Sequence, residues 1–181
     1  MYFRPKNEVN ICGKVVNIYH TNEVTIITFD CSRKNYPKIV VPKKLLLENP
    51  NITEGCILTV FGCLRNNLPG CGKTTFSILA EEIEVIDDEP VMFRNEFYLT
   101  AEIEHVRKSY NKVIVSTKVD CDGTISYIPV TLPMSALKQI DIIEKGKCFR
   151  CCGFIRTGKT FDENGVCKYF EEYIAQGWIF D

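Results

Sequence analysis

The sequence has almost no net charge, although a quarter of its residues are charged. Its 22 lysines and arginines are balanced by 23 aspartates and glutamates, so the formal net charge is −1 at pH 7. A polybasic protein of the histone kind, which binds nucleic acid through its total charge, is therefore excluded. A nucleic-acid site in this chain has to be a local cluster of cations.

Long apolar runs are also missing. No run approaches the ~20 apolar residues that a membrane-spanning helix requires, and residues 1–6 contain no apolar signal core. We therefore predict no membrane association and a cytoplasmic location. The ten cysteines could suggest a secreted disulfide scaffold, but without an export signal we predict that they are reduced and mostly structural.

Residues typical of catalytic and metal sites are scarce. The two histidines, His20 and His105, have no serine or cysteine partners that would make a nucleophilic site. Cys148 and Cys151 have the spacing of half a zinc ribbon, but a second C-x-x-C pair is absent. We predict no metal, no cofactor and no enzymatic activity.

One motif favours a nucleotide-binding enzyme. Residues 153–160 match the phosphate-loop pattern G-x-x-x-x-G-K-[ST] letter for letter. That loop binds phosphates only when it lies between a buried strand and a helix, whose N-terminal amides point at the ligand. Here the chain continues into Asn164 and Gly165, which are a hairpin turn signal. We predict a β-hairpin at this place instead of a nucleotide site.

The sequence contains an internal repeat of about half its length. Three landmarks of the first half recur in the second half at the same offset of 91 residues. Such a repeat indicates two similar structural units. The acidic stretch 87–90 marks the join, and we predict domains over residues 1–88 and 91–181. The landmarks are Pro42 with Pro133, Gly55 with Gly146, and Gly62 with Gly153.

Each half is rich in strand patterns. Val9, Ile11 and Val15 fall at even separations, as one buried face of a strand requires. The helical candidates are residues 43–47 in the first half and 134–143 in the second, each between the third and fourth strand. Five strands with one helix in that place is the chain order of the OB-fold, a small Greek-key barrel. We predict an all-β protein of two tandem five-stranded OB-fold barrels, each with a short helix between strands three and four.

Short motifs of the first half resemble those of bacterial and phage single-stranded DNA-binding proteins. Residues 60–65, VFGCLR, are similar to the fourth-strand signature of that family. Residues 7–15 are similar to its first strand, and residues 73–76 and 80–85 to its fifth. The order in which these motifs occur is the stronger part of the resemblance.

The resemblance implies a function. Members of the family bind single-stranded DNA without sequence specificity in replication, recombination and repair, and single-stranded RNA is the alternative ligand here. They assemble four OB domains, which implies a homodimer for a chain of two. The only tryptophan is Trp178, which implies an aromatic platform that differs from the family's. The alternative function is an OB-fold protein-interaction module, primosomal in type or a structural dimer, with weak or no nucleic-acid binding.

Charge is segregated along the chain. Residues 30–76 contain seven cations and three anions, and residues 145–168 contain six cations and two anions. In OB-folds the ligand lies on strands two and three and against the loops after strands one and four, which is where these stretches fall. A single strand is bound by cations that follow its phosphates and by aromatic faces on which its bases stack. We therefore predict two basic grooves with interleaved aromatic residues.

The predicted binding residues are cations and aromatic residues of these stretches and of matching positions elsewhere. Arg65 and Arg156 end equivalent strands and match the arginine of the family's pattern, so we predict that they contact phosphates. Tyr36, Tyr110 and Tyr127 lie beside turns and cations, where they are either stacking residues or ordinary surface tyrosines. The full predicted set is Lys14, Arg33, Lys34, Tyr36, Lys38, Arg65, Lys73, Phe76, Arg107, Tyr110, Lys118, Tyr127, Arg150, Arg156, Lys159, Phe161 and Lys168.

Overall fold

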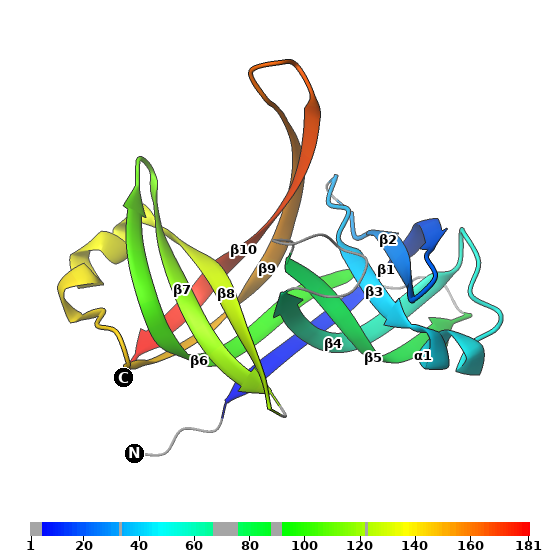
Figure 1. Cartoon of the computed structure of the whole chain (residues 1–181), viewed down its shortest axis with the longest axis horizontal. Coiled ribbons are helices and arrows are strands. Elements are labelled where there is room, and N and C mark those ends of the chain that lie inside the picture. Colours follow the sequence, from blue (N-terminus) through cyan, green and yellow to red (C-terminus); the bar gives the residue numbers. More distant parts are fainter. Residues whose placement is uncertain (1–4, 33, 67–75, 88–91, 122) are drawn as a thin grey trace.

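A computed structural model of the chain describes residues 5–32, 34–66, 76–87, 92–121 and 123–181. The prediction of an all-β protein is confirmed, because strands dominate both halves (Figure 1). The N-terminal half contains β1 (Lys6–His20), β2 (Val24–Asp30), β3 (Lys38–Pro42), α1 (Lys43–Glu48), β4 (Ile57–Asn66) and β5 (Phe76–Ile86). The C-terminal half contains β6 (Arg94–Ser109), β7 (Lys112–Cys121), β8 (Thr124–Pro133), the 3-10 helix η1 (Met134–Ile142), β9 (Cys148–Phe161) and β10 (Cys167–Phe180).

The strand pairings of each half run in a closed circuit. In the N-terminal half β1 pairs with β2, β2 with β3, β3 in parallel with β5, β5 with β4, and β4 with β1. In the C-terminal half β6, β7, β8, β10 and β9 follow the same order and return to β6. Each circuit is closed by a short parallel ladder, which comprises two residue pairs between β3 and β5 and two between β8 and β10.

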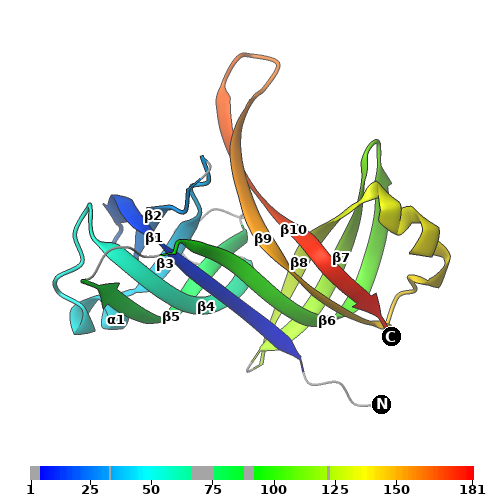
Figure 2. The same cartoon turned by 180° about the vertical axis from the view of Figure 1, so that it is seen from behind.

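The two halves are joined strand to strand. Lys6–Cys12 of β1 pairs antiparallel with Arg94–Thr100 of β6, and this ladder merges both circuits into one ten-stranded sheet. Figure 2 shows β1 and β6 lying side by side through the middle of the molecule. The apolar core is continuous across this junction. Phe97 faces Val9 across the junction and is fully buried. Its ring meets that of the buried Tyr173, of the same half, edge to face with centroids 6.1 Å apart.

The halves are related by an approximate two-fold axis. The Asn7 side chain pairs with the backbone of Leu64, accepting from its N–H at 2.9 Å and donating to its carbonyl at 2.8 Å. Asn95 makes the same pair of bonds with Ile155, at 3.0 and 2.7 Å. Both asparagines stand two residues before the pair of Val9 and Phe97, which face each other in the β1–β6 ladder. The axis therefore passes beside that pair.

The glycine landmarks of the repeat have a packing reason. A Cβ atom on Gly62 would stand 2.1 Å from the carbonyl oxygen of Leu79, and one on Gly153 would stand 1.9 Å from that of Ile174. Neither distance is sterically allowed, so only glycine lets β4 and β9 approach their neighbouring strands this closely. The shared offset that the sequence shows at these positions thus reflects one backbone arrangement that is used twice.

The phosphate-loop pattern lies within strand β9. Residues 153–160 are extended and pair with β10, and the hairpin loop begins after Phe161, so the prediction of a β-hairpin is confirmed. Gly158 of the pattern lies under the Phe170 ring, whose nearest atom would be 2.6 Å from an added Cβ. The glycine therefore makes room for a cross-strand side chain.

The cysteines whose side chains the structure describes form no disulfide with one another, and most are buried. Burial raises the pKa of the Cys31 and Cys63 thiols to about 12, which keeps them protonated and unreactive. Within the described ranges, no helix is both long enough and apolar enough to cross a membrane.

Candidate nucleic-acid interface

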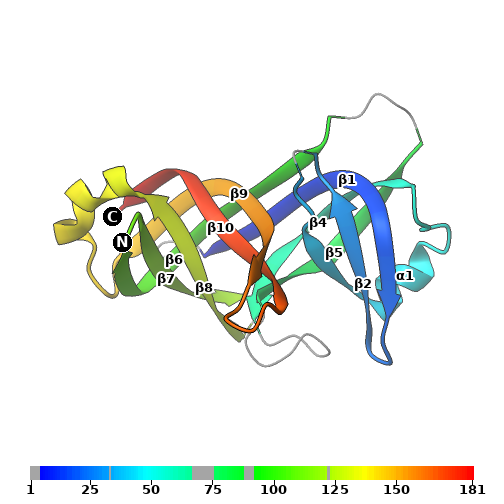
Figure 3. The ribbon, with the colours of Figure 1, turned by 90° about the horizontal axis from the view of Figure 1, so that it is seen from above.

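A long hairpin stands out from the body of the molecule. Strands β9 and β10 pair from Phe149 and Phe180 at the base to Phe161 and Cys167 near the tip. Figures 1 and 3 show this hairpin rising between the two halves, with its tip away from the C-terminal residue. The Asp162 carboxylate closes the loop at the tip by accepting hydrogen bonds from the backbone N–H groups of Asn164 and Val166, at 3.0 and 2.9 Å.

The hairpin is fastened to the N-terminal half at a contact that we call the seam, formed by Asn35, Tyr36 and Lys38 of one half and Ile155, Thr157 and Glu171 of the other. Asn35 donates to the Ile155 carbonyl at 2.6 Å and accepts from the Thr157 N–H at 2.8 Å. The Tyr36 N–H donates to the Thr157 hydroxyl at 2.7 Å. The β2–β3 loop and the middle of the β9–β10 hairpin therefore share directed hydrogen bonds.

Beside the seam, the ammonium groups of two lysines lie close to one tyrosine ring. Tyr169 of β10 lies directly opposite Lys159 of β9, whose Nζ is 5.1 Å from the centre of the tyrosine ring. The Nζ of Lys38, at the start of β3, lies 5.1 Å from the centre of the same ring. Tyr169 is 65% exposed. We call Lys38, Lys159 and Tyr169 the lysine–tyrosine cluster, and it draws its members from both halves.

Further binding candidates lie around this cluster. Lys34 is exposed in the β2–β3 loop with a φ of 61°, and the Tyr36 side chain, two residues on, is 43% exposed. Phe161 is 68% exposed at the end of β9. The structure thus brings Lys34, Tyr36, Lys38 and Lys159 of the predicted set together on one side of the molecule.

A carboxyl group is built into the seam. The Lys38 N–H donates to Glu171 Oε1 at 2.9 Å. Burial of Glu171 raises its pKa to about 7, against the opposing effects of that hydrogen bond and of the Lys38 charge. The group therefore titrates near neutral pH within a cationic surrounding.

The C-terminal half carries a second, smaller group of predicted residues. Lys118 of β7 and Tyr127 of β8 are direct cross-strand neighbours, and Tyr127 is exposed. At the β6–β7 turn, Arg107 is exposed and Tyr110 is 99% exposed. Lys118 with Tyr127 is one pair and Arg107 with Tyr110 is the other. The pairs lie on the adjoining strands β6, β7 and β8 and on the β6–β7 turn, and each offers a cation with a tyrosine.

Three predicted cations are neutralised by carboxylates of the chain itself. Arg156 forms an ion pair with Glu172, which is also bound by Lys112 at 2.5 Å. Burial works to raise the pKa of Glu172, but hydrogen bonds from Lys112, Arg156 and Thr131 hold it below its ordinary value. The other two ion pairs are Arg150 with Asp181 and Lys168 with Asp162.

The remaining predicted residues are dispersed. Lys14 is exposed on β1. The Arg65 guanidinium donates to the Thr124 carbonyl of the other half at 3.3 Å. Arg33 and Lys73 lie outside the described residues, and so does the side chain of Phe76, which begins β5.

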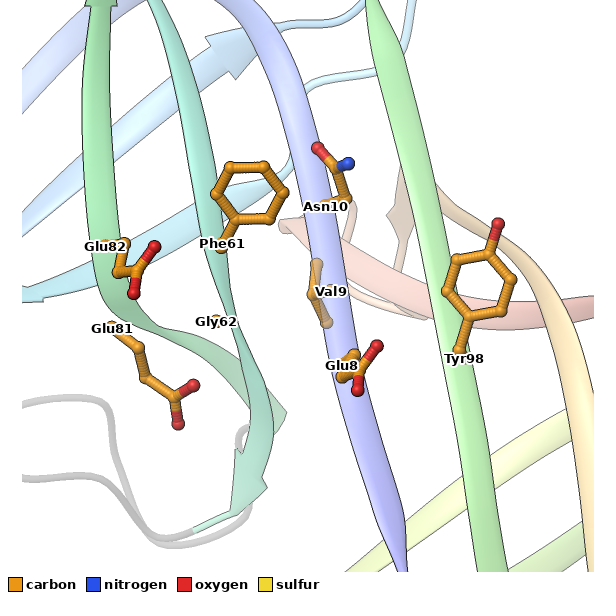
Figure 4. A pocket seen from close by; sticks show the side chains of 8 residues that line it. All are labelled: Glu8, Val9, Asn10, Phe61, Gly62, Glu81, Glu82 and Tyr98. Carbon is orange, nitrogen blue, oxygen red and sulfur yellow. The ribbon is translucent and has the colours of Figure 1, made fainter.

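The outer face of the central strands has the opposite charge. Figure 4 shows a shallow groove there, lined by Glu8 of β1, Glu81 and Glu82 of β5, and the rings of Phe61 and Tyr98. Both rings are partly exposed. A polyanion is repelled by such a surface, so the groove is no site for phosphates. The described residues also contain no group of three or more potential metal ligands.

Comparisons with known proteins bear on the fold. No family model matches the sequence, and no curated protein matches it. A variant of the single-stranded DNA binding protein from Thermus aquaticus, with a deletion and a substitution, superposes with a TM-score of 0.72 at 13% identity, over 98% of this chain and 95% of that chain. For the wild-type protein of that organism the TM-score is 0.68 at 13% identity, over 99% and 94% of the two chains. The chain therefore shares its fold with these structures over nearly its whole length.

Proposed function

We propose that the chain binds single-stranded DNA without sequence specificity, as a protein of two OB-fold domains that span residues 1–88 and 91–181. The closed strand circuits, with α1 and η1 between the third and fourth strand of each half, support the OB assignment. The fold shared with a protein whose name states that it binds single-stranded DNA supports the ligand. The proposed role is binding in replication, recombination or repair, without catalysis.

The lysine–tyrosine cluster is the observation that carries this proposal. Among the described residues, neither Lys38 nor Lys159 is ion-paired, so both ammonium groups are free to meet phosphates. The exposed aromatic side chains of Tyr36 and Phe161 lie on the same segments, two residues from Lys38 and Lys159 respectively. Phosphate neutralisation and base stacking at ~1–3 kcal/mol per base are the two contributions that non-specific strand binding needs.

The proposed interface has a main part and a second part. The main part is the surface around the seam. The second part is the group of Lys118, Tyr127, Arg107 and Tyr110 in the C-terminal half. For Arg150, Arg156 and Lys168 we propose a smaller contribution, because a phosphate has to displace a carboxylate that is already bound.

Fluorescence anisotropy of a labelled oligo-dT tests the proposal. We expect binding whose affinity falls steeply between 50 and 200 mM salt, since each neutralised phosphate contributes about −0.7 to the logarithmic salt slope for a single strand. An oligo-rU of equal length measures the preference between DNA and RNA, and a duplex of equal length is the control for general attraction to polyanions. Absence of oligo-dT binding at 50 mM salt would refute the function.

A second candidate is a protein-contact role, with the outer face of β5, β4, β1 and β6 as the surface. Phe61 and Tyr98 stand partly exposed on it among carboxylates, and exposed aromatic residues are enriched at protein interfaces. A homodimer, which would unite four OB domains, is the assembly that we propose for the chain. Light scattering that returns the mass of one chain at all concentrations contradicts the homodimer without affecting the DNA proposal.

A further inference from the structure

The lysine–tyrosine cluster has a property that neither half has alone. Lys38 belongs to β3 of the N-terminal half, while Lys159 and Tyr169 belong to the hairpin of the C-terminal half. Both lysines lie at the same distance, 5.1 Å, from the centre of one ring. A cation near an aromatic face is attracted by the ring's quadrupole, so Tyr169 holds two charges together that would otherwise repel each other.

The hydrogen bonds of the seam fix this arrangement. The Thr157 hydroxyl accepts from the Tyr36 N–H at 2.7 Å and lies 3.1 Å from Asn35 Oδ1, to which it donates. Thr157 stands two residues before Lys159 on β9, and Tyr36 stands two residues before Lys38. Thr157 and Lys159 share a face of β9, because alternate strand residues do. The Lys38 N–H donates to Glu171, which lies opposite Thr157 on β10, so the hydrogen bonds of the seam hold the backbone of Lys38 against the strands that carry Lys159.

We propose that Lys38 and Lys159 form one composite phosphodiester-binding site, in which a single strand crosses from one half to the other and neighbouring phosphates are held beside Tyr169. Asn35 and Thr157 are its positioning residues: they keep the hairpin docked and do not touch the strand. The site rests on the proposed function and specifies where the strand passes between the halves.

The composite site has a measurable signature in the salt dependence. Removing one phosphate contact lowers the slope by about 0.7, which reduces the ratio of affinities between 50 and 200 mM salt by about 2.6-fold. We expect Lys38→Gln and Lys159→Gln each to show this loss. Lys43→Gln, which removes an exposed cation from α1 of the same half, is the matched control and leaves the slope unchanged.

The positioning role is tested without touching a charge. Thr157→Val removes the hydroxyl but keeps the shape, and we expect it to lower the slope even though the net charge is the same. In the Thr157→Val background, Lys159→Gln should have less effect than in the wild-type chain, because the site is already disturbed. Thr160→Val, at an exposed position further along β9, is the control. Circular dichroism and a thermal melt of each variant establish that it is folded.

Amide hydrogen exchange gives a second reading on the unmodified chain. With oligo-dT bound, residues 34–38 and 157–171 should both gain protection, while residues 43–48 should not. If oligo-dT binds but both lysine variants behave like Lys43→Gln, or Thr157→Val leaves the slope unchanged, the composite site is wrong and the proposed function stands. If the wild-type chain binds no oligo-dT at 50 mM salt, the function and the site fall together.

Discussion

The carboxyl group of Glu171 makes the stability of the chain depend on pH in an unusual direction. Its pKa is about 7 in the folded chain, whereas an unfolded glutamate titrates near 4.3. The folded state therefore binds the proton more tightly than the unfolded state. Ionisation of Glu171 therefore lowers the free energy of unfolding. This loss is absent below the unfolded pKa, grows as the pH rises between the two pKa values, and is complete above about pH 7.

The size of this loss follows from the difference between the two pKa values. At 1.36 kcal/mol per pH unit the difference corresponds to about 3.7 kcal/mol. Because Glu171 is only partly buried in the seam, solvent screening reduces this, and we expect about 2 kcal/mol. Glu171→Gln removes the charge while its side-chain oxygen still accepts the Lys38 N–H. The variant should therefore be about 2 kcal/mol more stable than the wild-type chain at pH 8 and equal to it at pH 4.5.

Urea unfolding of both proteins from pH 4.5 to 8.5 measures this difference. In thermal melts the same 2 kcal/mol corresponds to about 4–8 °C at this chain length. Glu163→Gln, on the exposed loop of the same hairpin, is the control and should follow the wild-type profile. A Glu171→Gln difference that stays constant between pH 5 and 8, or a variant that is less stable at pH 8, would show that Glu171 is not held in a desolvated place.

Three further outcomes test other parts of the structure. Gly153→Ala places a Cβ against the Ile174 carbonyl oxygen and should destabilise the chain by about 3 kcal/mol in urea unfolding. In the control, Gly177→Ala, the added Cβ meets only the Cys152 sulfur at 3.3 Å, so the loss should be less than about 1.5 kcal/mol. Equal losses would contradict the argument that a backbone atom requires glycine at position 153. Tyr110→Ala should leave the melting temperature unchanged, because the ring is almost fully exposed. It should weaken oligo-dT binding by about 1–3 kcal/mol if a base stacks on the ring. Unchanged affinity rules out stacking at this position. Lys112→Met removes one partner of the half-buried Glu172 carboxylate and should cost about 1–3 kcal/mol at pH 7. The loss should shrink as the pH falls through the lowered pKa of Glu172 and the carboxylate becomes protonated.

The repeat could be predicted from the sequence because it depends on local constraints. Gly62 and Gly153 are conspicuous by their shared offset, and each is required by a backbone atom of the neighbouring strand. The helix after the third strand was also predictable, as α1 confirms. In the second half the segment predicted as helical, 134–143, forms the 3-10 helix η1 over nearly the same residues.

The seam could not be predicted, because it depends on how two distant segments meet. Asn35 and Ile155 are 120 residues apart, and no periodicity within either half brings them together. Tyr169 was therefore absent from the predicted binding set. A two-residue turn at Asn164 and Gly165 would have placed it opposite Thr160, whereas the longer loop closed by Asp162 shifts the register by one residue and places it opposite Lys159.

Tyr169 is missing from the predicted binding set, whereas Arg156 is in that set although it is already ion-paired. The sequence predicts that Arg156 ends a strand and is a free cation. This is wrong, because β9 continues to Phe161, and Glu172 faces Arg156 directly across the β9–β10 ladder and forms an ion pair with it. A pairing register is needed to see this, and the register depends on the same loop.

The symmetric ladder of β1 and β6 has a consequence for how such a chain could have arisen. Since Val9 and Phe97 occupy equivalent places and face each other, the first strand of a half-length ancestor would have been able to pair with the same strand of a second copy. Duplication and fusion of that ancestor would make the pairing of the two copies intramolecular, so that it no longer depends on protein concentration. They would also let each copy drift on its own: Lys14 in one half now corresponds to Glu102 in the other, a divergence in charge that identical subunits could not sustain.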